Sequence, residues 1–279
     1  MSNWTRITAV LDRDPEDWSL LVDCFERHGC ASTQQTDNPP TLSGYMAEIQ
    51  GSDERVRQLS SDLRKMGVAN VEQENVQDED WAETWKKFFK TRRVGKSIVI
   101  RPTWESYEPG PNDIEIVLDP GQAFGTGDHP TTRLCLELLQ EVEVRGREVA
   151  DIGCGSGILA IAAVKLGASS VIGSDLDEQS VEISRANARL NDVEVDFSVA
   201  AGFASMEKPR PVVLSNIISA TLIRLAPEAA ANVKAGGRWV VSGIIQQNWP
   251  DVLAAANKVG FSLEKTMQED EWIAAILRR

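Results

Sequence analysis

A glycine-rich turn between a strand and a helix constrains the fold of this chain more than any other feature. Residues 151–157, with the sequence DIGCGSG, follow the strand-like stretch 148–152 and open a helix. Glycines at such a turn let the backbone approach a ligand without interference from a Cβ atom. In a doubly wound sheet the turn lies beyond the carboxyl ends of the strands, where these folds bind ligands.

Strands and helices alternate from residue 147 onward, which predicts a mainly parallel sheet with crossover helices. The last two strands, 261–268 and 271–277, have only two residues between them, so we expect an antiparallel hairpin. The fold class is therefore α/β, a Rossmann-like doubly wound sheet with a C-terminal antiparallel hairpin. The other expected elements are strands 148–152, 169–175, 193–199, 211–217 and 237–244 and helices 156–166, 178–190, 220–233 and 249–259.

The first third of the chain has a different pattern. Its expected elements follow the order βαββαβ, which is typical of a small ferredoxin-like α+β domain. A connecting helix over 78–90, with Trp81, Trp85 and Phe88 on one stripe, is expected to follow. We therefore predict a first domain at 1–76, a linker helix and hinge at 77–100, and a second domain at 101–279.

Charge and composition exclude several classes of protein. The formal net charge is −13, and residues 1–85 alone hold 7 basic and 17 acidic residues. Such a charge disfavours nucleic-acid binding and membrane-surface binding, since both need clustered Lys and Arg. The absence of a long apolar stretch and of a signal-peptide pattern predicts a cytoplasmic protein. Four cysteines without a CxxC pair and only two histidines predict no metal site.

The glycine turn and the residue closing the next strand indicate a nucleoside ligand. Ile158 stands where the dinucleotide pattern GxGxxG needs its third glycine, which favours a ligand without phosphates, such as S-adenosylmethionine. Asp175 can accept hydrogen bonds from both hydroxyls of a ribose. Taken alone, Asp175 could instead cap the next helix, because Glu178 follows it at capping-box spacing.

Two more segments carry polar groups suited to a site. Residues 118–132, LDPGQAFGTGDHPTT, lead into a helix in which Pro130 suits the first turn, with Asp128 or His129 as the cap. Asn216 closes the expected strand 211–217, and its side-chain oxygen could accept a hydrogen bond from an amine nucleophile. The alternative is an Asn that satisfies its own turn.

Together these segments resemble the bacterial ribosomal protein L-eleven methyltransferase family, the PrmA family. The motifs are LDPGxAFGTGxHPTT at 118–132, DxGCGSGILAIAA at 151–163, the acidic Asp175, and NI at 216–217 followed by LAP at 225–227. The resemblance implies a class I methyltransferase domain at 101–279 with S-adenosylmethionine as cofactor. It also implies that this cofactor contacts four residues, Thr132, Gly153, Asp175 and Asn216. We include four more residues of the same motifs in the predicted cofactor site, namely Phe124, Gly125, Asp151 and Gly155.

The resemblance further implies a reaction and a partner. The acceptors would be amino groups of a ribosomal large-subunit protein, namely lysine side chains with the N-terminal amine as a further candidate, and residues 1–76 would grip that protein. Asn216 is then the group expected to orient the amine, while His129 is either a proton acceptor or an anchor of its loop. We expect a basic protein substrate and a monomeric enzyme. The alternatives are a methyltransferase of the same fold for another protein or a small molecule and, ranked lower, a nicotinamide-dependent oxidoreductase.

Overall fold

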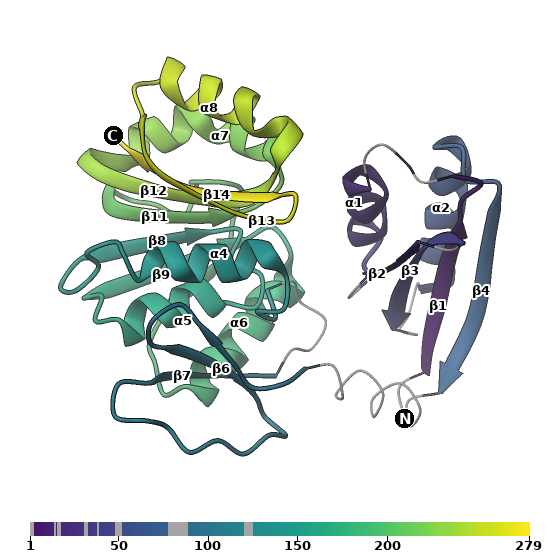
Figure 1. Cartoon of the computed structure of the whole chain (residues 1–279), viewed down its shortest axis with the longest axis horizontal. Helices are drawn as coiled ribbons and strands as arrows, with labels where there is room; N and C mark the ends of the chain where they lie inside the picture. Colours follow the sequence, from purple (N-terminus) through teal and green to yellow (C-terminus); the bar gives the residue numbers. More distant parts are fainter. Residues whose placement is uncertain are drawn as a thin grey trace. The chain divides into compact units, whose positions relative to one another are not determined.

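The computed structural model describes residues 3–13, 15, 18–30, 33–37, 39–47, 52–77, 89–119 and 125–279. The chain divides into two compact units, Met1–Phe89 and Lys90–Arg279, which are described separately (Figure 1). Residues 78–88 of the expected linker helix, with Trp81, Trp85 and Phe88, lie outside the described residues, and residues 89 and 90, its expected end, are not helical. The domain boundaries at 76 and 100 stay predictions.

The second unit is built on a seven-stranded sheet in the order β10-β9-β8-β11-β12-β14-β13. Neighbouring strands are parallel from β10 to β12, whereas β14 is antiparallel to both strands that flank it. Sequence predicted both the mainly parallel sheet and the closing hairpin, and both are confirmed. The strands are β8 (Glu148–Ile152), β9 (Ser170–Asp175), β10 (Asp196–Val199), β11 (Arg210–Asn216), β12 (Val233–Ile245), β13 (Ser262–Glu269) and β14 (Trp272–Arg278).

Helices cover both faces of this sheet, as Figure 1 shows. One hydrophobic core lies under α4 (Pro130–Leu139), α5 (Ile158–Lys165) and α6 (Glu178–Leu190). A second core lies under α7 (Ser219–Asn232) and α8 (Trp249–Lys258), with the short 3-10 helix η1 (Gln246–Asn248) before α8. Because helices cover both faces, strands such as β8 and β11 are buried along nearly their whole length.

A three-stranded sheet precedes the main sheet, and sequence patterns did not predict it. It consists of β5 (Arg92–Val94), β6 (Ile98–Pro102) and β7 (Ile114–Leu118) in the order β5-β6-β7. Side chains from all three strands are buried in the core under α4 and α5. Its first strand has three residues, two of them arginines, so the run lacks the apolar alternation by which strands are recognised. This sheet begins within the stretch predicted as linker.

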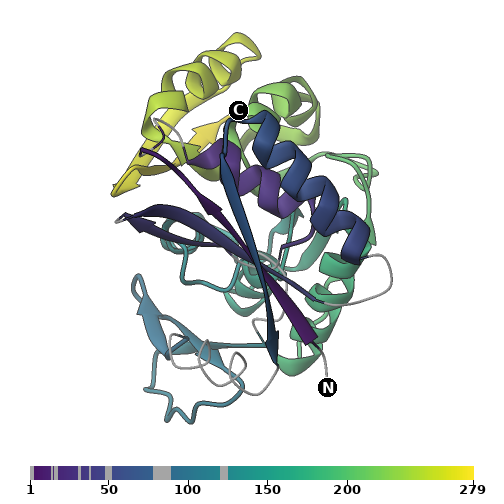
Figure 2. The same ribbon diagram turned by 90° about the vertical axis from the view of Figure 1, so that its right-hand side faces the viewer.

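The first unit has the expected order βαββαβ, and its strands form an antiparallel sheet in the order β2-β3-β1-β4 (Figure 2). Both helices contribute to a single core with one face of the sheet. The assignment of this first unit to the ferredoxin-like class stays a prediction. The elements are β1 (Asn3–Val10), α1 (Ser19–Arg27), β2 (Thr33–Asp37), β3 (Pro40–Ala47), α2 (Ser52–Lys65) and β4 (Asn70–Gln77).

Candidate active site

The glycine turn, residues 153–157, joins β8 to α5 at the carboxyl edge of the main sheet. Gly153, Gly155 and Gly157 have φ of +78°, +51° and +80°, which side chains with a Cβ rarely adopt. A Cβ atom on Gly153 would lie 2.4 Å from Cγ2 of Ile217, the second residue of the NI motif. The turn therefore packs directly against the end of β11, and two predicted motifs meet there.

Asp175 ties the glycine turn to the turn that follows β9. Its Oδ2 accepts from the backbone N–H of Gly155 at 2.9 Å, and its Oδ1 accepts from that of Asp177 at 3.1 Å. The cap of α6 is Asp177, which accepts from the N–H groups of Gln179 and Ser180. Asp175 is therefore not the cap of α6. Its two oxygens can accept further hydrogen bonds from hydroxyl groups.

Asp151 is a fully buried carboxyl group below the glycine turn. Its Oδ2 accepts from the N–H of Ala160 at 3.1 Å, and within the described part of the chain its Oδ1 has no hydrogen-bond partner. Burial is the main cause that raises the pKa of Asp151 to about 7, and the negative charge of Asp175 adds to it. A buried oxygen without a donor is costly, so this atom is suited to a ligand that donates a hydrogen bond or carries positive charge.

Asn216 presents a second buried oxygen at the same edge. Its Nδ2 donates to Oγ1 of Thr132 at 3.2 Å, and Thr132 is itself fully buried in the first turn of α4. The Oδ1 atom of Asn216 is buried and lacks a partner among the residues described. The amide therefore does not satisfy its own turn, because one of its groups bonds to α4 and the other is left open.

Residues 125–129, the described part of the loop before α4, lie against the glycine turn. Ser156 Oγ donates to the carbonyl oxygen of Gly125 at 2.7 Å. A Cβ atom on Gly127 would lie 2.4 Å from Cδ1 of Ile100, so strand β6 supports the loop from its other side. Phe124, one of the predicted cofactor residues, lies outside the described residues.

His129 anchors this loop to its surroundings. Its Nδ1 pairs with Oγ1 of Thr131 at 2.8 Å and caps α4, and its ring packs edge-on against Trp272 at 4.7 Å. Burial, together with the charge of nearby Arg133, lowers the pKa of His129 to about 4. A neutral imidazole with such a low pKa is a weak base at neutral pH, which favours the anchoring role over proton acceptance.

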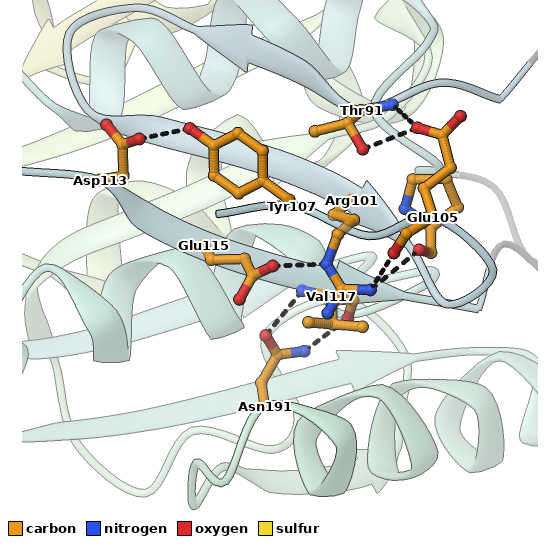
Figure 3. Close-up of polar contacts among 9 residues, drawn as sticks. Thr91, Arg101, Glu105, Tyr107, Asp113, Glu115, Val117 and Asn191 are labelled. Carbon is orange, nitrogen blue, oxygen red and sulfur yellow. Dashed lines mark hydrogen bonds and ion pairs between the residues drawn. The ribbon is translucent and has the colours of Figure 1, made fainter. Parts of the chain in front are cut away.

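Helix α6 attaches the three-stranded sheet to the site. Asn191 accepts from the N–H of Val117 and donates to its carbonyl oxygen, at 2.9 and 2.6 Å (Figure 3). One turn earlier, Asn187 accepts from the N–H of Asp119 and donates to the carbonyl oxygen of Ser156. The two asparagines therefore fix the start of the 118–132 segment beside the glycine turn.

Sequence reasoning missed these two asparagines, although a signal for them exists. Asn187 and Asn191 lie four residues apart, in the last turn of α6 and at its C-cap, and both are buried where apolar residues are expected. Polar residues on a buried helix face usually bond to backbone, as these do.

Seven of the eight predicted cofactor residues are described, and the structure brings them to one edge of the sheet.

Comparison with known proteins gives the family of this chain. The family model described as ribosomal protein L11 methyltransferase (PrmA) matches residues 9–279. The chain belongs to this family. It is an S-adenosylmethionine-dependent methyltransferase, and the resemblance inferred from the four motifs is confirmed.

Relatives and a solved structure agree with this assignment. A ribosomal protein L11 methyltransferase of Geobacter sulfurreducens is 41% identical over 93% of this chain and 86% of its own. The protein of the same name from Streptococcus uberis is 37% identical over 100% and 97%. The crystal structure of ribosomal protein L11 methylase from Lactobacillus delbrueckii subsp. bulgaricus is 30% identical, with a TM-score of 0.65 over 69% of this chain and 98% of that one. The class I methyltransferase fold is therefore confirmed.

The described residues contain neither a membrane-spanning helix nor a metal-binding cluster. No helix described here is both long and apolar enough to cross a membrane. No group of three or more His, Cys, Asp or Glu side chains in the described ranges could hold a metal ion.

The buried carboxyl of Asp151 predicts a pH dependence of stability. Its folded pKa of about 7 lies above the ordinary aspartate value of 3.8, so the folded chain keeps a proton that the unfolded chain loses. The free energy of unfolding of the cofactor-free protein should therefore fall as pH rises from about 4 to 7, by up to about 4 kcal/mol.

Urea unfolding of the wild type and Asp151→Asn at pH 4 to 8 checks this expectation. The variant retains an acceptor for Ala160 but cannot ionise, so the gap between the two stability curves should change in favour of the variant as pH rises. Parallel curves would show that Asp151 does not titrate in this range.

Proposed function

We propose that this enzyme transfers methyl groups from S-adenosylmethionine to amino groups of ribosomal protein L11, on lysine side chains and, as a further acceptor, the N-terminal amine. The relatives carry the name of that substrate. The observation that supports an amine acceptor is the buried Oδ1 atom of Asn216, which no described residue bonds, at the carboxyl edge of the sheet beside the glycine turn.

The residues present fit the cofactor. S-Adenosylmethionine offers ribose hydroxyls, an ammonium group and a sulfonium whose methyl group is electrophilic. Asp175 would accept from the ribose hydroxyls, and the buried Oδ1 of Asp151 is an acceptor near the turn for a cationic donor. The glycines at 153 and 155 would let the backbone contact the ligand, and Thr132 and Gly125 would border it.

A lysine substrate must first lose a proton, because its unperturbed pKa is near 10.4. Asn216 Oδ1 would accept one N–H of the neutral amine and so direct the nitrogen lone pair toward the methyl group. Its Nδ2, held by Thr132, fixes the amide in the orientation that presents the oxygen. Because His129 is uncharged and only weakly basic at neutral pH, the proton of the lysine ammonium would leave to water or to a backbone oxygen.

Positioning supplies most of the rate in this proposal, since the reactive group is carried by the cofactor. Holding an amine in line with a methyl group is worth an effective molarity of about 10⁵ to 10⁸ M, roughly 7 to 11 kcal/mol of the barrier. A rigid edge of buried strands is suited to this task. The described groups of the site belong to strands, to helix ends or to turns bonded to them.

Charge supports a basic protein as the partner. The net charge of −13 is concentrated in the first third of the chain, and such a field speeds the encounter with a basic protein and repels RNA. We therefore propose that the first unit binds the substrate protein. A ribosomal substrate also places the proposed activity in the cytoplasm, and we propose that the enzyme acts as a monomer.

Methylation of purified L11 tests the proposal. The enzyme is incubated with L11 and S-adenosylmethionine carrying a deuterated methyl group, and intact mass and peptide mapping follow. We expect labelled methyl groups on lysines, and none when the lysines and the N-terminal amine have been acetylated beforehand. Label on other side chains, or none on L11 alongside label on RNA or on small molecules of a lysate, would contradict it.

A further inference from the structure

The carboxylate of Glu105 holds the start of the second unit. Glu105 Oε2 accepts from the backbone N–H and from Oγ1 of Thr91 at 2.5 and 2.7 Å (Figure 3). Its Oε1 pairs with Lys90 at 2.9 Å. These contacts lower the pKa of Glu105 to about 2, chiefly through the two bonds from Thr91. The carboxylate is ionised at neutral pH, and the backbone just before β5 is held in place.

The next residue, Arg92, reaches the loop that lies on the glycine turn. Its Nη2 pairs with Oδ1 of Asp128 at 2.5 Å, and the two side chains are 35% and 29% exposed. The Nε atom of Arg92 is buried and has no partner within the described ranges. The guanidinium is thus partly removed from water and directed at one carboxylate, unlike a freely solvated surface arginine.

Asp128 is bonded through its backbone as well. Its carbonyl oxygen accepts from Nη1 of Arg133, whose guanidinium also pairs with Glu269 of β13. Three residues before Asp128 lies Gly125, whose carbonyl oxygen accepts a hydrogen bond from Ser156 of the glycine turn. Among the described residues, the side chain of Asp128 therefore pairs with Arg92 of β5, its backbone bonds to Arg133 of α4, and the backbone of Gly125 bonds to the glycine turn.

We propose that Arg92 is a positioning residue for methyl transfer: through Asp128 it holds residues 125–129 against the glycine turn in the geometry that binds the cofactor. This inference rests on the proposed cofactor site at that turn. Arg92 lies in the first strand after the segment that joins the two units. The position of this strand is therefore coupled to the cofactor loop by an ion pair.

The neighbouring residue in β5 provides a matched control. Arg93 also forms an ion pair, with Asp113 at 2.6 Å. Asp113 further accepts from the hydroxyl of Tyr107 (Figure 3) and from the backbone N–H of Gly110, not from residues 125–129. Loss of either arginine removes one partly exposed ion pair of β5. Only the loss of Arg92 removes a contact to residues 125–129.

The test measures binding of S-adenosylhomocysteine by calorimetry, together with thermal melting, for Arg92→Met, Asp128→Asn, their double variant, Arg92→Lys and Arg93→Met. We expect binding about five- to tenfold weaker in both single variants and no further loss in the double variant, because the pair acts as a unit. Arg92→Lys should recover part of the affinity. Arg93→Met should bind as the wild type does.

Kinetics separate positioning from a purely structural role. In Arg92→Met, KM for the cofactor should rise while KM for the protein substrate stays within twofold. Equal binding by Arg92→Met and Arg93→Met, or a fall in melting temperature with unchanged affinity, would overturn the inference. Failure of the proposed function is distinguishable, because the calorimetric ratio of variant to wild type does not depend on which acceptor is methylated.

Discussion

Replacing Asp175 by alanine should weaken the binding of S-adenosylmethionine about 100-fold or more. The carboxylate is expected to accept two ribose hydroxyls, and hydrogen bonds to a charged group contribute roughly 1.5 to 3 kcal/mol each. The variant also loses the bond from Gly155, which holds the glycine turn against β9. Calorimetric titration with S-adenosylmethionine and with S-adenosylhomocysteine measures the effect directly.

Asp177→Ala is the control for this prediction. Asp177 lies two residues further on and caps α6, so its loss should cost about 1 kcal/mol of stability and leave cofactor affinity nearly unchanged. Asp175→Asn separates charge from hydrogen bonding, since it retains one acceptor oxygen. If Asp175→Ala bound the cofactor as tightly as Asp177→Ala does, the ribose contact would be refuted.

Replacing Asn216 by alanine should lower kcat about 100-fold while cofactor affinity falls far less. In the proposed reaction Asn216 Oδ1 orients the amine, and a misplacement of about 1 Å at the reacting atoms can cost 10²-fold in rate. Single-turnover methylation of L11 with enzyme in excess measures this step without product release. The dissociation constant for S-adenosylhomocysteine is measured on the same preparation.

Thr132→Val tests how the amide is held. The variant keeps the shape of Thr132 but leaves Asn216 Nδ2 without its acceptor. We therefore expect kcat to fall, by a smaller factor than in Asn216→Ala. A normal kcat in Asn216→Ala with weakened cofactor binding would show that Asn216 is only a cofactor contact. In that case another group must orient the amine.

Patterns local in the chain predicted most of the fold. The glycines at 153–157 permit the positive φ that a tight turn needs, and alternating strands and helices need crossover connections, so both features can be predicted from neighbouring residues alone. The antiparallel hairpin of β13 and β14 followed from a spacing of two residues. Strand β5 was not predicted because it is short and rich in arginine, and its strand character comes from pairing with β6. Strands β6 and β7 do carry β-branched apolar residues, a signal that could have predicted them.

Residue types at the site were determined by the sequence, and their contacts were decided by the tertiary structure. The glycines, Asp175 and Asn216 were identified from motifs, but the bond from Asn216 to Thr132 joins residues 84 positions apart. The same holds for Ser156 with Gly125, Asn187 with Asp119, and Arg92 with Asp128. Backbone conformation depends on near neighbours, whereas these contacts exist only because packing of the whole sheet brings distant segments to one edge.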